Sequence, residues 1–132
     1  MRKLPPTLAL LALAACAPSG ERPETAAADR VPAATPVGEA RSCIPIRSIR
    51  ESRVRSDRVI DFVTTGRQVY RVTLPQDCPG LGFEQRFAYA TSLSQLCQQD
   101  IITVLYQTGG PQRGASCGLA PFQPVRLADG RR

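Results

Sequence analysis

Few side chains in this sequence are suited to chemistry, and the first constraint is the complete absence of histidine. Without histidine the chain lacks the commonest general base and the usual metal ligand, and it cannot assemble a Ser/His/Asp or Cys/His nucleophilic system. A pair of carboxylates, as in sugar hydrolysis, would have to come from Asp61, Glu84 and Asp100. None of them stands in a catalytic motif, and we expect each to be an ordinary solvated or hydrogen-bonded acid at a strand edge. We therefore expect no catalytic residue and no cofactor.

The five cysteines are the other reactive candidates, and their spacing argues against redox or metal chemistry. Cys16 follows an apolar run near the N-terminus, and gaps of 35, 19 and 20 positions separate the four that come later. No C-x-x-C pair occurs, so a thioredoxin-like motif is absent. A zinc site would need ligands clustered in the sequence, and we expect no metal site. The four later cysteines are Cys43, Cys78, Cys97 and Cys117.

The N-terminus has the layout of a secretory signal. Arg2 and Lys3 are followed by an apolar stretch over residues 8–13, too short to cross a bilayer, which takes about 20 apolar residues. The stretch ends in Leu13-Ala14-Ala15-Cys16, which resembles the lipobox of bacterial lipoproteins. The resemblance implies lipidation of the Cys16 sulfur and removal of residues 1–15 as a signal peptide. The alternative is an ordinary cleaved signal with an incidental cysteine.

The resemblance also implies a cellular location, and the composition after Cys16 predicts how the mature chain is divided. Ala17, and not aspartate, follows the cysteine, which favours an outer-membrane anchor facing the periplasm. Residues 16–41 are rich in Pro, Ala, Gly, Glu and Thr, a composition that cannot bury enough apolar surface to fold alone. We expect a lipidated, disordered tether there, one folded domain over residues 42–128 and a short tail over residues 129–132.

Such a small domain is marginal without cross-links. In an exported chain, an even number of cysteines besides Cys16 indicates two disulfides, each stabilising by about 2–4 kcal/mol. Three pairings are open, and the sequence does not choose among them.

Short runs of β-branched and aromatic residues predict a mainly β domain. Residues 58–64 and 68–74 flank Gly66 and are expected to pair as a hairpin. Residues 101–106, the most apolar run, should form a central strand. Five or six short strands between Gly/Pro turns predict a small disulfide-stapled barrel or sandwich. Further strands are expected within residues 44–49, 83–90 and 117–127, and one helical turn within residues 91–99.

The surroundings of the cysteines carry a second resemblance. The chain contains five short motifs in this order: CI at 43–44, RVIDF at 58–62, CPGL at 78–81, LCQQDII at 96–102 and CGLAPF at 117–122. This order over residues 42–123 resembles a group of small exported proteobacterial proteins classified only as a domain of unknown function. The resemblance implies one exported, disulfide-bonded domain and assigns it no activity.

The charge pattern points to anionic partners. The chain has 17 basic and 11 acidic residues, and every basic residue after Lys3 is arginine, whose planar fork matches carboxylates and phosphates. In a cell envelope the polyanions are lipid A phosphates, anionic headgroups and acidic wall polymers, and nucleic acid is the wrong partner there. The alternative is a solvated loop between two strands. The candidate anion-binding residues are Arg47, Arg50, Arg53, Arg55 and Arg58.

Two function classes remain. The first is a non-catalytic envelope lipoprotein that binds a partner protein or an anionic surface through residues 47–58. The second is an inhibitor of, or a small hydrolase acting on, cell-wall components, with the loop over residues 109–116 as the contact of an inhibitor. The absence of histidine and of any catalytic motif favours the first class.

Overall fold

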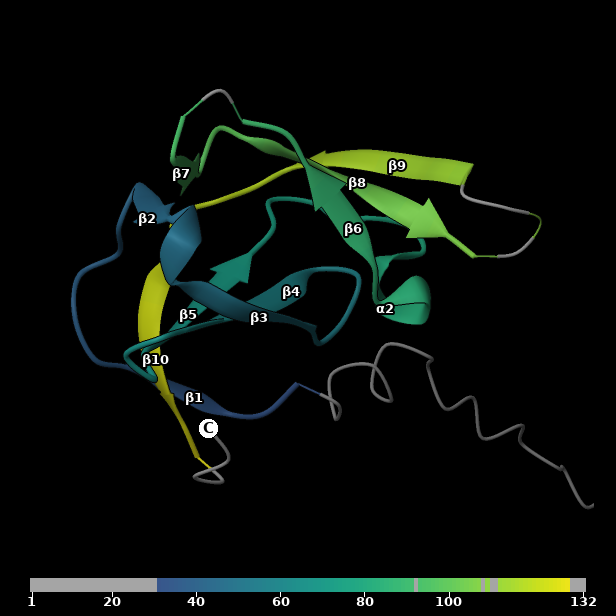
Figure 1. Cartoon of the computed structure of the whole chain (residues 1–132). Helices are drawn as coiled ribbons and strands as arrows, with labels where there is room; N and C mark the ends of the chain where they lie inside the picture. Colours follow the sequence, from purple (N-terminus) through teal and green to yellow (C-terminus); the bar gives the residue numbers. More distant parts are fainter. Residues whose placement is uncertain (1–30, 92, 108, 110–111, 129–132) are drawn as a thin grey trace, which may run out of the picture.

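The computed structural model describes residues 31–91, 93–107, 109 and 112–128, which form a mainly β, sandwich-like structure with no closed barrel. Figure 1 shows a five-stranded sheet lying beneath a second layer of strands. No helix in the described part of the chain has the length and apolar character needed to cross a membrane. The elements are β1 (Ala34–Pro36), β2 (Cys43–Pro45), η1 (Ile46–Ser48, a 3-10 turn), β3 (Ile49–Val54), β4 (Val59–Thr64), β5 (Val69–Thr73), α2 (Leu81–Glu84), β6 (Phe87–Tyr89), β7 (Gln95–Cys97), β8 (Ile101–Tyr106), β9 (Gln112–Gly118) and β10 (Gln123–Leu127).

The five-stranded sheet has the order β1-β10-β5-β4-β3, with all pairs antiparallel. Its centre is the β4–β5 hairpin, which confirms the pairing expected from the sequence. Arg67 closes the connecting turn with a positive φ of 63°, and its N–H donates to the Thr64 carbonyl. The alternation of β4 and β5 sends one set of side chains into the core and the other set to the outer face of the sheet.

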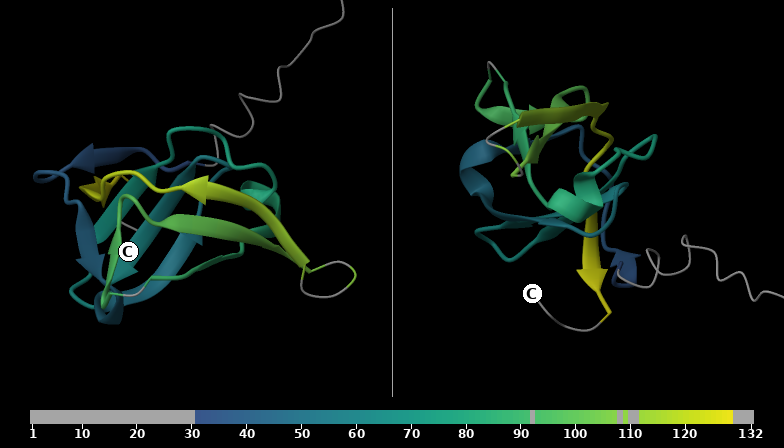
Figure 2. Two further views of the ribbon diagram at one scale, coloured as in Figure 1. Left: turned by 90° about the horizontal axis from the view of Figure 1, so that it is seen from above. Right: turned by 90° about the vertical axis from the view of Figure 1, so that its right-hand side faces the viewer.

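The second layer is a three-stranded sheet of order β6-β8-β9, with the β2–β7 pair beside it. The expectation of a central strand over residues 101–106 is confirmed, because β8 pairs with a strand on each side. Two of its side chains, Ile102 and Val104, are fully buried against the first sheet. Seen from above in Figure 2, the β8–β9 hairpin extends beyond the end of the larger sheet.

The core lies between the two layers. Phe62 of β4 and Phe122 are fully buried, and their rings meet edge to face at a centroid separation of 5.6 Å. Aliphatic side chains from both sheets, Ile60, Val72 and Leu96 among them, complete the cluster. A smaller apolar group, centred on Val69, Val125 and Leu127, occupies the outer face of the five-stranded sheet.

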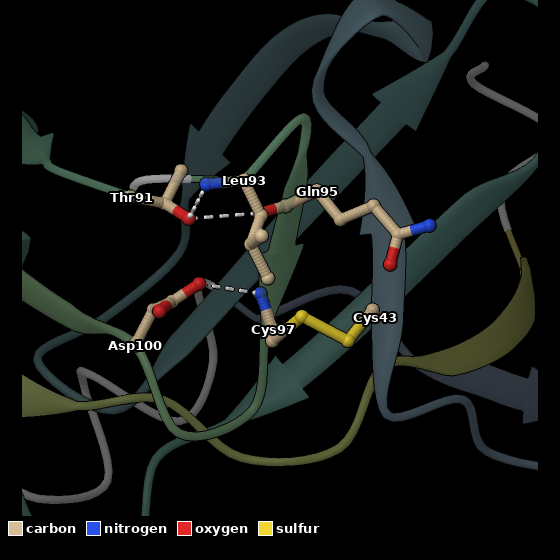
Figure 3. The surroundings of a disulfide bond; sticks show 6 residues. All are labelled: Cys43, Thr91, Leu93, Gln95, Cys97 and Asp100. Carbon is tan, nitrogen blue, oxygen red and sulfur yellow. Dashed lines mark hydrogen bonds between the residues drawn. A yellow bond between two sulfur atoms is a disulfide. The ribbon is translucent and has the colours of Figure 1, made fainter.

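Two disulfides staple this structure, as the even number of cysteines predicted. Cys43 pairs with Cys97 across the directly opposed strands β2 and β7, and Cys78 pairs with Cys117 of β9. Figure 3 shows the first bridge beside the turn that ends at Asp100, whose carboxylate accepts a hydrogen bond of 2.7 Å from the Cys97 N–H. The choice among the three pairings comes from the fold, which brings these segments together.

Several local expectations are wrong in detail. Residues 44–49 are not one strand: β2 ends at Pro45 and the chain turns through η1 before β3 starts. Residues 83–90 divide into the end of α2 and the strand β6, with the Phe83 side chain almost fully exposed. The helical turn expected within residues 91–99 is replaced by β7. These segments are short, so pairing with a neighbouring strand outweighs their weak local preference.

The folded unit also begins before residue 42. Residues 34–36, inside the stretch expected to be a tether, form β1 and pair with β10 at the edge of the larger sheet. The Val37 N–H then donates to the Pro124 carbonyl, and Arg41 forms a bridge with Phe122. Cys16, the rest of the expected signal and tether up to residue 30, and the tail over residues 129–132 lie outside the described residues.

Candidate functional site: the arginines of the five-stranded sheet

The outer face of the five-stranded sheet carries a buried charged group. Asp61 on β4 stands opposite Arg53 of β3 and opposite Arg71 of β5, so the register places all three on one face. The Asp61 side chain has no solvent exposure. A solvated or hydrogen-bonded acid at a strand edge was expected here; Asp61 is hydrogen-bonded, but the edge position is wrong because β4 is an interior strand of the sheet.

Asp61 is satisfied by two guanidinium groups. Arg55 Nε donates to Asp61 Oδ2 at 2.8 Å. Arg71 binds side-on, with Nε to Oδ1 at 2.8 Å and Nη2 to Oδ2 at 3.0 Å. Because a buried carboxylate is costly unless it is paired and hydrogen-bonded, these three bonds explain why the sheet tolerates it. Arg55 is therefore a structural partner of Asp61.

Two more of the five candidate arginines take part in local contacts. Arg53 Nη2 donates to Glu51 Oε2 at 2.9 Å, and this hydrogen bond lowers the pKa of Glu51 and raises the pKa of Arg53. Arg58 donates from Nε to the Leu74 carbonyl and from Nη2 to the Pro75 carbonyl, which holds the end of β5. The segment is thus not the solvated loop that the alternative interpretation described, since half of its residues form the edge strand β3.

The remaining two candidates are exposed and joined by a third arginine that the sequence did not single out. Arg47 lies on η1 and Arg50 is the extra residue of a β-bulge at the start of β3. The Thr65 N–H donates to the Ser48 carbonyl at 2.8 Å, which docks the β4–β5 turn, with Arg67, against η1. All three side chains are exposed, and none forms a hydrogen bond or ion pair with another described residue. We call Arg47, Arg50 and Arg67 the basic corner.

Only the tertiary structure reveals Arg67 as part of this group. It lies 17 positions after Arg50 in a turn whose only visible sequence signal is a glycine. If the pairing of β3 with β4 had been known, the β4–β5 turn would have been expected beside the start of β3. That expectation would have placed Arg67 near Arg50.

Comparison with known proteins adds no functional assignment. No protein-family model matches the chain, and no curated protein or solved structure matches it either.

The three acids considered for a catalytic pair belong to separate local structures. Asp61 is bound by arginines, Asp100 caps the Cys97 turn, and Glu84 ends α2. Among residues 31–91, 93–107, 109 and 112–128, no group of three or more His, Cys, Asp and Glu side chains is gathered as a metal site would need. The loop considered for an inhibitor contact is in large part strand, since β9 starts at Gln112, and residues 110 and 111 lie outside the described part.

Proposed function

We propose that this protein is a lipid-anchored module of the bacterial cell envelope that binds an anionic membrane surface and catalyses no reaction. The observation that carries the proposal is the basic corner, where three exposed arginines on adjoining segments have no side-chain partner among the described residues. By contrast, Arg53, Arg55 and Arg58 each donate hydrogen bonds to other residues of the domain. The corner therefore offers charge that the fold itself does not use.

The physical basis is electrostatic attraction near an anionic leaflet. Each arginine close to such a surface contributes about 1 kcal/mol, and the attraction decays within a Debye length, which is ~8 Å at physiological salt. A guanidinium can also bind a phosphate through two parallel N–H bonds. A lipid at Cys16 would keep the domain near the membrane, so a weak headgroup contact suffices to orient it. The lipobox resemblance at Cys16 implies that the domain is anchored in the outer membrane and faces the periplasm.

The test is vesicle co-sedimentation of the full chain carrying Cys16→Ser, so that lipid anchoring does not mask the weaker contact. The double variant Arg50→Gln/Arg67→Gln should bind phosphatidylglycerol vesicles roughly ten- to thirtyfold more weakly, at about 1 kcal/mol per arginine. Arg86 and Arg113 are also exposed but lie in the other layer, so Arg86→Gln/Arg113→Gln is the control with equal charge. Equal losses in both doubles would show that net charge alone, and not the corner, governs binding.

The anchor is tested separately by peptide mapping of membrane-extracted protein. Lipid on an N-terminal Cys16, with residues 1–15 removed, is the expected result. A free Cys16 thiol in the mature chain would contradict the lipoprotein assignment and leave the vesicle result standing on its own.

A further inference from the structure

A second site, independent of the basic corner, lies where the N-terminal arm meets the five-stranded sheet. We define the arm as residues 31–41, which include β1. Arg71 Nη1 donates to the Pro32 carbonyl at 2.8 Å, and Gln123 Nε2 donates to the Gly38 carbonyl at 2.8 Å. Side chains of the sheet thus hold the arm on both sides of β1, which in Figure 1 runs alongside β10. The arm is therefore held against β5 and β10 by side-chain hydrogen bonds.

A pocket of about 320 Å³ lies where the arm meets β10 and β5. Arg71, Thr73 and Gln123 bring polar groups to it from β5 and β10, whose register places Gln123 directly opposite Arg71. Ala34 and Ala40 of the arm also line the pocket, together with Ala120. The volume is at the lower end of the range for small-molecule sites. The alanines leave room for methyl-sized groups.

The polar groups of the pocket keep unused hydrogen-bonding capacity. A guanidinium has five N–H donors, and Arg71 directs three of them to Asp61 and Pro32. Two donors of Arg71 therefore have no partner among the described residues. The Thr73 hydroxyl is likewise without a partner there. Gln123 donates from its amide nitrogen to two carbonyls, and no described residue donates to its amide oxygen.

The net charge of the Arg55, Arg71 and Asp61 side chains decides which ligand the pocket suits. Two guanidinium groups, Arg55 and Arg71, share the single carboxylate of Asp61, so the cluster carries one net positive charge. One positive charge with few neighbouring donors balances a monoanion better than a dianionic phosphate. Arg71 is mostly buried, with 13% of its side chain exposed, so its remaining charge is less screened than that of a surface arginine.

We propose that this pocket binds a small aliphatic monocarboxylate, in particular the C-terminal alanine carboxylate of a peptide. Arg71 and the Thr73 hydroxyl would donate to the carboxylate. The side-chain methyl group would pack against the alanines of the arm. The Gln123 amide oxygen would accept from the terminal peptide N–H.

The probe is N-acetyl-alanyl-alanine, titrated into the isotope-labelled full chain and followed by backbone amide chemical shifts. We expect shifts confined to the arm, β5 and β10, with a dissociation constant on the order of 1 mM for a ligand of this size. The C-terminal amide of the same dipeptide should bind at least tenfold more weakly, because it lacks the charge. Equal binding of the acid and the amide, or no shifts with the acid, would overturn the proposal.

Two variants and a control locate the site without disturbing the Asp61 pairs. Ala40→Phe should fill the pocket and abolish the shifts, and Thr73→Val should weaken binding about tenfold by removing one donor to a charged group. Ala88→Phe places the same bulk on an exposed position of β6, outside the pocket, and should leave binding unchanged. Retained binding in Ala40→Phe would place the ligand elsewhere and overturn the assignment.

Inorganic phosphate separates carboxylate recognition from general anion binding. It should give no saturable shifts at the pocket, and binding there as tight as that of the dipeptide would overturn the choice of a monocarboxylate. The Arg50→Gln/Arg67→Gln variant should bind the dipeptide normally, so failure at the pocket and failure at the basic corner can be told apart.

Discussion

Asp61 and Arg71 stand directly opposite each other on β4 and β5, and their side chains pair side-on through bonds of 2.8 and 3.0 Å. The same guanidinium donates to the Pro32 carbonyl. This pair therefore links the interior of the sheet to the N-terminal arm, which is otherwise held by backbone pairing with β10 and by Gln123. Its integrity should matter to stability well beyond a surface ion pair.

Replacing Asp61 with asparagine should destabilise the domain by about 3 kcal/mol, because two largely buried guanidinium groups lose their countercharge. Urea denaturation measures the loss. Glu51→Gln is the matched control, since the Glu51–Arg53 pair lies at the surface and should contribute less than about 1 kcal/mol. A similar small loss in both variants would show that the Asp61 network is energetically neutral.

Gly114 should not tolerate a side chain. A Cβ at this position of β9 would overlap the ring of Tyr106 on the neighbouring strand, in the bulged part of the β8–β9 pair. Gly114→Ala should cost about 1–3 kcal/mol, as overpacking does. Gly118→Ala on the same strand meets nothing within 4 Å and should change stability little. Equal thermal unfolding midpoints for the two variants would contradict this packing.

The two disulfides should contribute comparably to stability. They join residues 54 and 39 positions apart, and restriction of the unfolded chain over such loops is worth about 4 kcal/mol each. Replacing either pair with alanines should lower the free energy of unfolding by several kcal/mol. Urea denaturation of each variant in oxidising buffer measures this loss. A change below about 1 kcal/mol would mean that the unfolded chain is already compact without that bridge.

Glu51 should titrate below its ordinary pKa of 4.5, because the Arg53 guanidinium donates a hydrogen bond to its charged form. A lowered folded-state pKa means that the pair adds stability above the unfolded-state pKa, and that this contribution disappears as the pH falls through the folded-state pKa. Carbon NMR of the side-chain carboxyl measures the shift, and Arg53→Gln should return the pKa toward 4.5. An unchanged midpoint in that variant would show that Arg53 is not the cause.

Local sequence pattern was sufficient to predict the secondary structure of the segments that have a strong β pattern of their own. Residues 58–64 and 68–74 combine β-branched side chains with a glycine turn, so the β4–β5 hairpin was predictable. The apolar run at residues 101–106 predicted a central strand, and Ile102 and Val104 of β8 are fully buried. The number of disulfides followed from the cysteine count. Short segments such as 83–90 and 95–97 carry too little pattern to define their structure.

The sequence by itself determined a mainly β, disulfide-stapled domain, because composition, alternation and cysteine count are properties of neighbouring residues. Only the tertiary structure decided which cysteines pair, that Asp61 is buried between Arg55 and Arg71, and that Arg67 joins the basic corner. It also placed residues 34–36 in the sheet, although their composition predicts a tether, because the edge of β10 offers hydrogen-bonding partners to any extended segment beside it. Strand register sets the Cys43–Cys97 and Asp61–Arg71 pairings, and register is a property of the whole sheet.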